Sequence, residues 1–176
     1  MTQVVPAAMA DTDIVKITGA QTIGGVKTFS SQPNYPAQSM VRLNTANGYG
    51  STNTKIRRFT TVVTNQGSDI TYADSATLGA SFTINTNGVY SVCYSDQFTS
   101  AGWVGLSLNT AAPTTSMPTI SASEILVSAT SSTAAGAGVA SWVGYLAAGA
   151  IVRAHTDGVA TGGNANAGQF TITRVA

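Results

Sequence analysis

Short runs of alternating apolar and polar residues recur from Ile56 to the end of the chain, with turn-forming residues between them. Val and Ile far outnumber Leu in these runs, and β-branched residues favour strands over helices. Strands this short, at this spacing, indicate an all-β sandwich or barrel. The pattern predicts nine strands, over residues 56–64, 68–73, 81–85, 88–98, 102–109, 123–130, 139–146, 150–156 and 168–175.

The beginning of the chain lacks this pattern. Residues 1 to about 45 hold three of the five prolines, and their two apolar patches, Ile14–Ile17 and Ile23–Phe29, are too small to build a core. The Asn, Gly, Thr and Ser residues of 44–51 are typical of a flexible hinge. We therefore expect an extended N-terminal arm over residues 1–52 and a head domain over residues 53–176.

Composition narrows the functional classes. Charged residues make up 9% of the chain, against about 25% in an average soluble domain, and the net charge is +1. A protein that binds nucleic acid by neutralising phosphates needs a basic excess, so we expect no nucleic-acid partner. An apolar fraction of 43% argues against intrinsic disorder. The weakly charged surface fits a protein that is covered by copies of itself, although Thr-rich exposed strands are also compatible with water.

Two segments mimic signals for export or membrane insertion. The triplet Ala8–Ala10 resembles a cleavage site, but no basic region precedes it and Pro6 interrupts the apolar stretch, so we expect no signal peptide. Residues 134–152 are almost uncharged, yet Trp142 and Tyr145 would lie at the centre of a membrane span instead of at its ends. The alternative is a pair of buried strands joined by a turn at 147–149. We expect no membrane insertion.

Candidate chemistry is sparse. His155 and Asp157 would share one face of a strand, but no Gly-x-Ser-x-Gly elbow accompanies them, and no nucleotide-binding or zinc-binding spacing occurs. We therefore expect neither enzymatic activity nor a cofactor. The lone Cys93 is expected to be a small, half-buried side chain on the face opposite Tyr90 and Tyr94. The basic cluster Lys55–Arg58 is expected to pair with Asp69, Asp74 or a neighbouring subunit.

Adhesion to a sugar would use exposed aromatic and amide side chains on loops. Trp103 is the leading candidate, with a core or interface position as its alternative. The loops at 109–121 and 157–168 are the natural variable tips. Candidate adhesion residues are therefore Trp103, Asp157, Asn164 and Asn166. The last three, with His155, also form a weak candidate metal cluster, although Asn and Gly are common in loops for conformational reasons.

The stretch TGAQTIGGVKTFSS at residues 18–31 resembles an element that recurs in bacteriophage tail-fibre and related virion surface proteins. The resemblance implies a segment that associates as three parallel chains in a fibre shaft or basal anchor. The element occurs once here, whereas fibres often carry several copies. The candidate anchoring side chains of the arm are the apolar residues of its two patches, Ile14, Ile17, Ile23, Val26 and Phe29.

Most of residues 56–176 resembles the jelly roll of the C1q/TNF family. The matching positions begin with Phe59, Gly67 and Tyr72 and continue with the segments 82–90, 104–109, 146–152 and 170–173. The family usually has Asp where this chain has Ala150. The resemblance implies an antiparallel jelly-roll sandwich that forms a compact homotrimer and serves as a binding head instead of an enzyme. The aromatic residues it places in the core or near the three-fold axis are Phe82, Tyr90, Tyr94, Tyr145 and Phe170.

The predicted strand over 88–98 bears on the homotrimer through its own residue pattern, independently of the family resemblance. Tyr90, Tyr94 and Phe98 share one face, together with Val92 and Asp96. Three aromatic side chains exceed what the core of a small sandwich needs, so part of this face is a candidate subunit interface. The alternative places all three in the intramolecular core.

Together these features predict a trimeric bacteriophage virion protein, assembled in the host cytoplasm and located on the virion surface. Its arm would dock on capsid or tail proteins and its head would project to solvent, as a spike or capsid decoration, with host surface glycans as a candidate ligand. Two alternatives stay open: a tail receptor-binding fibre proper, and a soluble C1q-like lectin unconnected with a virion.

Overall fold

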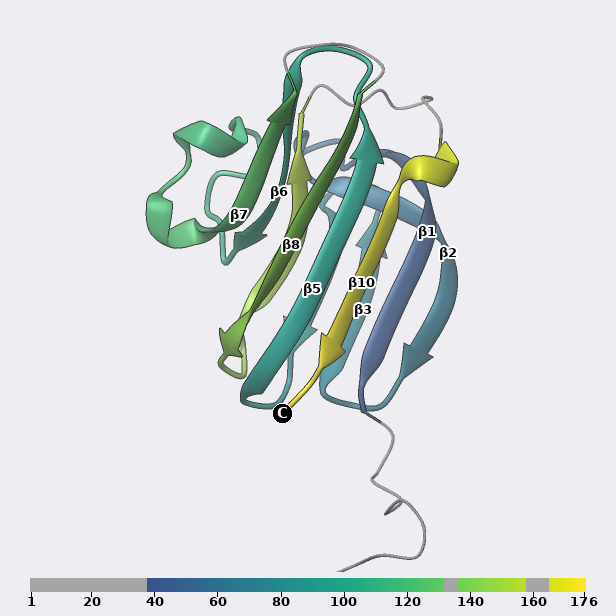
Figure 1. Cartoon of the computed structure of the whole chain (residues 1–176), viewed down its shortest axis with the longest axis vertical. Coiled ribbons are helices and arrows are strands. Elements are labelled where there is room, and N and C mark those ends of the chain that lie inside the picture. The colour runs from purple at the N-terminus through teal and green to yellow at the C-terminus, as the bar shows by residue number, and fades with distance from the viewer. Residues whose placement is uncertain (1–37, 132–135, 158–164) are drawn as a thin grey trace, which may run out of the picture. The chain divides into compact units, whose positions relative to one another are not determined.

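A computed structural model describes residues 38–131, 136–157 and 165–176, and its strands form two antiparallel five-stranded sheets (Figure 1). Among the described residues, three short 3-10 helices lie in connecting segments: η2 (Met117–Thr119), η3 (Ala122–Glu124) and η4 (Ala165–Ala167). The strands are β1 (Met40–Tyr49), β2 (Arg57–Gln66), β3 (Ile70–Ser75), β4 (Gly79–Ile84), β5 (Gly88–Gln97), β6 (Gly102–Leu108), β7 (Ile125–Ser131), β8 (Ala137–Leu146), β9 (Ile151–Thr156) and β10 (Gln169–Arg174).

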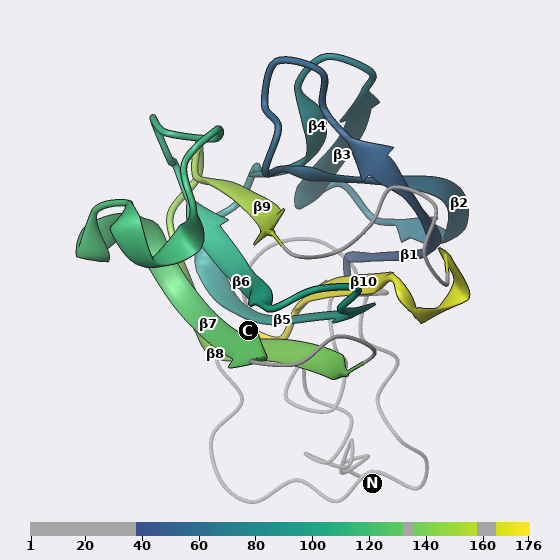
Figure 2. The ribbon, with the colours of Figure 1, turned by 90° about the horizontal axis from the view of Figure 1, so that it is seen from above.

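The two sheets have matching topologies. Sheet A has the strand order β2-β1-β10-β5-β8, and sheet B has the order β3-β4-β9-β6-β7. In each sheet a late strand, β10 or β9, lies between two early ones, so the chain passes repeatedly from one sheet to the other. Figure 2 shows the two layers from above. The all-β sandwich expected from the sequence is confirmed.

The core lies between the sheets and follows from the period-2 alternation of the strands. On β5, Tyr90, Val92 and Tyr94 point inward and are completely buried. Phe170 of sheet A stacks on Phe82 of sheet B, with ring centroids 3.8 Å apart and planes inclined by 6°. This aromatic stack joins the two sheets within the core.

All nine predicted strands are present, displaced by at most a few residues, whereas β1 was not predicted. Residues 40–49 pair with β10 on one side and β2 on the other, so the predicted hinge at 44–51 is wrong and the head begins before residue 53. Thr45 and Gly48 adopt positive φ angles of 63° and 69°, and the pairing with β2 shifts register twice. These irregularities break the alternation that identifies a strand. The arm itself, with Ile14, Ile17, Ile23, Val26 and Phe29, lies outside the described residues.

The basic cluster is held by carboxylates of the same chain. Arg58 pairs with Asp74 at 2.8 Å, as predicted, while Lys55 lies 3.9 Å from Asp157. Arg57 points into the core, where its Nε lies 2.8 Å from Oδ2 of Asp96. The basic residues of the cluster therefore form ion pairs inside the head domain.

The apolar segment 134–152 contributes two strands, β8 and β9, as the strand interpretation predicted. Gly149 occupies the turn between them with a φ of +88°, a conformation that favours glycine. None of the helices in the described part of the chain is long and apolar enough to span a membrane.

Candidate self-association face

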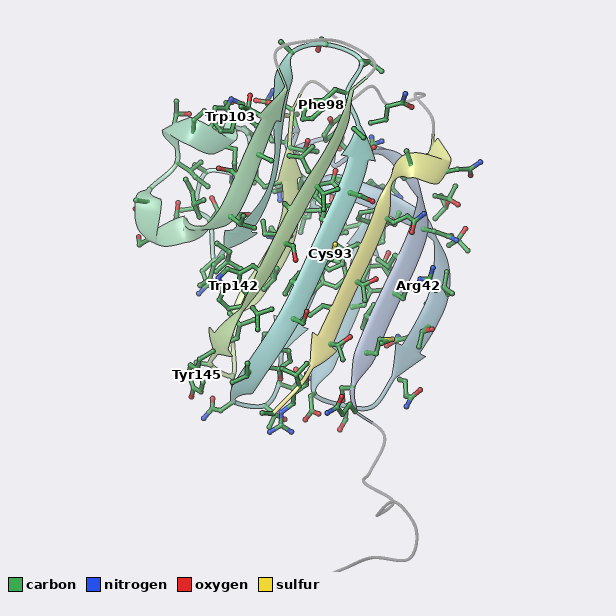
Figure 3. The ribbon with its side chains drawn as sticks, in the orientation of Figure 1. Arg42, Cys93, Phe98, Trp103, Trp142 and Tyr145 are labelled. Carbon is green, nitrogen blue, oxygen red and sulfur yellow. The ribbon has the colours of Figure 1, made fainter. Side chains whose placement is uncertain are left out.

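Four of the five strands of sheet A, namely β1, β10, β5 and β8, present outward side chains that together are called here the outer face of sheet A. The strand register places Arg42, Thr171, Cys93 and Ser141 side by side in one row across these four strands. Figure 3 shows Arg42, Cys93 and Tyr145 on these strands. The outer face of sheet A is therefore a continuous surface built from four strands.

This face carries almost no charge. Arg42 is the only charged side chain among its outward positions on the four strands, all of which are described. Near one margin, three large apolar side chains of β8 are exposed: Val139 by 56%, Val143 by 63% and Tyr145 by 63%. Exposed apolar side chains gathered along one strand are typical of a surface that another molecule covers.

β8 is also the last strand of sheet A, so one of its edges has no strand neighbour in that sheet. Soluble proteins usually protect such edges with charged residues or proline. The sequence of β8, AGVASWVGYL, contains neither. A second copy of the chain would cover both the edge and the apolar side chains beside it.

The prediction that β8 is a buried strand is correct for one side only. Gly138, Ala140 and Trp142 point inward, while Val139 and Val143 point to solvent. An edge strand that is apolar on both sides looks like a buried strand in sequence. Cys93 likewise differs from expectation: it lies opposite Tyr90 and Tyr94, as predicted, but it is exposed instead of half-buried.

Four of the five predicted core or interface aromatics belong to the intramolecular core: Phe82, Tyr90, Tyr94 and Phe170 are completely buried. The Tyr94 hydroxyl donates a hydrogen bond to Asp96 at 2.8 Å, and burial raises its pKa well above the ordinary value. Phe98, which directly follows β5, is 1% exposed. The aromatic face of β5, which was a candidate for either the core or a subunit interface, therefore points into the core. Of the five predicted aromatic residues, Tyr145 lies on the surface.

The candidate adhesion residues do not form one cluster. The carboxylate of Asp157 accepts hydrogen bonds from the backbone N–H of Trp103, at 2.7 Å, and from the Ser116 hydroxyl, so it closes one end of sheet B. Trp103 is half-buried. Asn166 is exposed on η4, which packs against β1 of sheet A, and Asn164 lies outside the described residues. The contacts of Asp157 are structural.

His155 is fully buried, and its Nε2 lies 2.8 Å from the carbonyl oxygen of Thr115. Burial lowers the pKa of its imidazole, so the ring is neutral at pH 7 and Nε2 donates to that carbonyl. Within the described ranges, no three His, Cys, Asp or Glu side chains gather as a metal site would require. His155 is thus part of the packing under the loop that contains Thr115.

No protein-family model matches the sequence, and a search of curated proteins gives no match. The structure, in contrast, is similar to crystal structures of murine APRIL determined at pH 8.5, pH 8.0 and pH 5.0, with TM-scores of 0.52, 0.50 and 0.52. The fold is a TNF-like jelly roll. Each match covers 79% of this chain and 100% of the other, at 13–14% sequence identity, so the likeness concerns the fold.

Proposed function

We propose that this TNF-like jelly roll is the head of a structural protein on the surface of a bacteriophage virion, where it forms a homotrimer. In this proposal the N-terminal arm docks on capsid or tail proteins and the head projects to solvent. The proposal rests above all on the outer face of sheet A, an almost uncharged surface with an apolar edge strand. The resemblance of residues 18–31 to virion surface proteins supports the location.

Self-association gives the exposed residues of β8 a physical role. Fully burying a Val or a larger apolar side chain contributes about 1.5–3 kcal/mol, and Val139, Val143 and Tyr145 would each gain part of that on assembly. The outward positions on β5 and β10 are uncharged, mostly Ser, Thr and Cys with Val89 beside Tyr145, so a second copy can approach them without burying charge. Because the Asp157 carboxylate is engaged inside the head, the proposal assigns the head a structural role and not an adhesive one.

Introducing a charge at the centre of this strip is expected to dissociate the trimer. Light scattering on the full-length protein should give three times the chain mass of 17.8 kDa. Val143→Asp should reduce the mass to that of one chain at the same protein concentration, because the carboxylate would lose its hydration in the interface. Leu78→Asp is the matched control: Leu78 is 50% exposed, lies in the turn between β3 and β4, and should leave the trimer intact.

A single-chain mass for the wild-type protein, or an intact Val143→Asp trimer, would rule out this interface. Docking is tested separately. Antibodies against the head should label purified virions, and deletion of residues 1–37 should abolish the label while the mass of the free protein stays threefold. Labelling that persists without the arm would contradict the anchoring role.

A further inference from the structure

Arg153, on β9 in sheet B, is a half-buried cation without a counter-ion in the described part of the chain. Four described carboxylates already pair with other basic residues: Asp69 with Arg174, Asp74 with Arg58, Asp96 with Arg57 and Asp157 with Lys55. The fifth, Glu124, accepts a hydrogen bond from the backbone N–H of Ala111 at 3.0 Å. Burial lowers the pKa of Arg153, and no nearby anion opposes that effect.

Two further polar side chains stand beside Arg153 on the outer face of sheet B. Ser107 is its direct partner on β6, and His155 lies two residues further along β9, so all three point to the same side. Ser107 and His155 are completely buried. Arg153 Nη1, Ser107 Oγ and His155 Nδ1 are each buried and have no hydrogen-bond partner among the described residues.

Such a grouping needs an explanation, because a buried polar group without a hydrogen-bond partner carries an energetic cost, which is larger when the group is charged. Three such atoms at adjacent positions of two paired strands would bear that cost together. A ligand that hydrogen-bonds to all three would remove it. The requirement is for a small group rich in acceptors, because a guanidinium can only donate.

The segment 109–124 covers one side of this grouping. Met117, completely buried, packs over Gly105, where an added Cβ would lie 2.5 Å from its Cε, and Gly105 is the register partner of His155. The carbonyl of Thr115 fixes the His155 ring through Nε2, which leaves Nδ1 for another contact. Arg153 itself is half-exposed, whereas Ser107 and His155 beside it are completely buried.

We propose that Arg153, Ser107 and His155 form a binding subsite for a small oxyanion, a phosphate or carboxylate group. Arg153 Nη1 and the Ser107 hydroxyl donate hydrogen bonds to its oxygens, and His155 Nδ1, which takes up a proton when the anion binds, donates a third. The subsite lies on the sheet opposite the self-association face, so it does not depend on the proposed function.

The proposal predicts a proton linkage. The charged groups around His155 are Asp157 and Glu124, which raise its pKa, Lys55, which lowers it, and Arg153 on its own strand. An anion at Nδ1 favours the protonated ring and therefore raises the pKa of His155. Oxyanion affinity is accordingly expected to increase as the pH falls from about 8 to about 6.

His155 is the sole histidine of the chain, so its imidazole resonances report the site directly. In the full-length protein, inorganic phosphate should shift the Nδ1 resonance until the site is saturated. It should also raise the melting temperature relative to chloride at equal ionic strength, and both changes should be half-complete at the same phosphate concentration. Arg153→Gln should weaken phosphate binding at least about tenfold. Arg42→Gln, the matched control on sheet A, should leave it unchanged.

The source of the anion is resolved by repeating the titration with glucuronate and with neutral glucose. Tighter binding of glucuronate than of phosphate identifies an acidic sugar, and tighter phosphate binding identifies free phosphate; glucose should have no effect. An absence of saturable change with both anions, or an equal loss in Arg153→Gln and Arg42→Gln, would overturn the subsite. If Arg153→Gln fails to fold, Ser107→Ala replaces it in the test, and an unaltered phosphate affinity in Ser107→Ala would overturn the subsite.

Discussion

Replacing Asp96 with Ala is expected to lower the free energy of unfolding by about 3–5 kcal/mol. The Oδ2 atom of Asp96 lies 2.8 Å from Arg57 Nε and 2.8 Å from the Tyr94 hydroxyl, and the side chains of Asp96 and Arg57 are each 1% exposed. Removing the carboxylate leaves a cation in the core without its counter-charge and a buried hydroxyl without its acceptor. The Arg57 guanidinium also lies over the ring of Tyr49, at 5.2 Å, but that contact does not neutralise its charge.

The chain provides a matched control in the neighbouring ion pair. Arg58 and Asp74 lie at the same distance, 2.8 Å, but their side chains are 24% and 21% exposed. Asp74→Ala should therefore cost less than about 1 kcal/mol, because water solvates the charge that remains. Urea unfolding at one fixed protein concentration, followed by tryptophan fluorescence, measures both variants. Equal losses in the two variants would show that burial does not set the strength of the Arg57–Asp96 pair.

The strands were predictable because two local signals agree in them: alternation along the strand and turn residues at its ends. β1 shows where those signals fail. Val41 and Leu43 point into the core, but the positive φ at Thr45 shifts the alternation before the strand ends at Tyr49. Its position between β10 and β2 then depends on pairing with the end of the chain, which no local pattern contains.

The candidate sites were less predictable, because they depend on what lies beside each strand. Alternation placed Tyr90 and Tyr94 on one face correctly, yet only the opposing sheet shows that the core fills that face. The sequence of β8 predicts a strand that is buried on both sides, because apolar residues occupy both. It does not distinguish a side covered by a second sheet from a side covered by a second copy of the chain. The pairing of Ser107 with Arg153 joins strands that are distant in sequence and follows from the jelly-roll topology.

Replacing Phe170 with Ala is expected to destabilise the head by about 3–5 kcal/mol, because it opens a cavity where the two sheets meet. Phe170 is completely buried on β10 and stacks on Phe82 of β4, and the rings of Phe59 and Tyr94 lie 6.0 and 6.3 Å from it. Three aromatic neighbours held by different strands cannot collapse into the space together, since each is fixed by its own packing.

Phe170→Leu is the control that separates lost volume from lost stacking. Leu fills most of the cavity but cannot stack on Phe82, so a loss of about 1–2 kcal/mol is expected in urea unfolding. A loss as large as that of Phe170→Ala would show that the aromatic geometry, and not the filled volume, joins the sheets. A loss below about 1 kcal/mol in both variants would contradict the central position of the stack. The remaining core, which includes Leu43 and Leu106, would then have to hold the layers together without it.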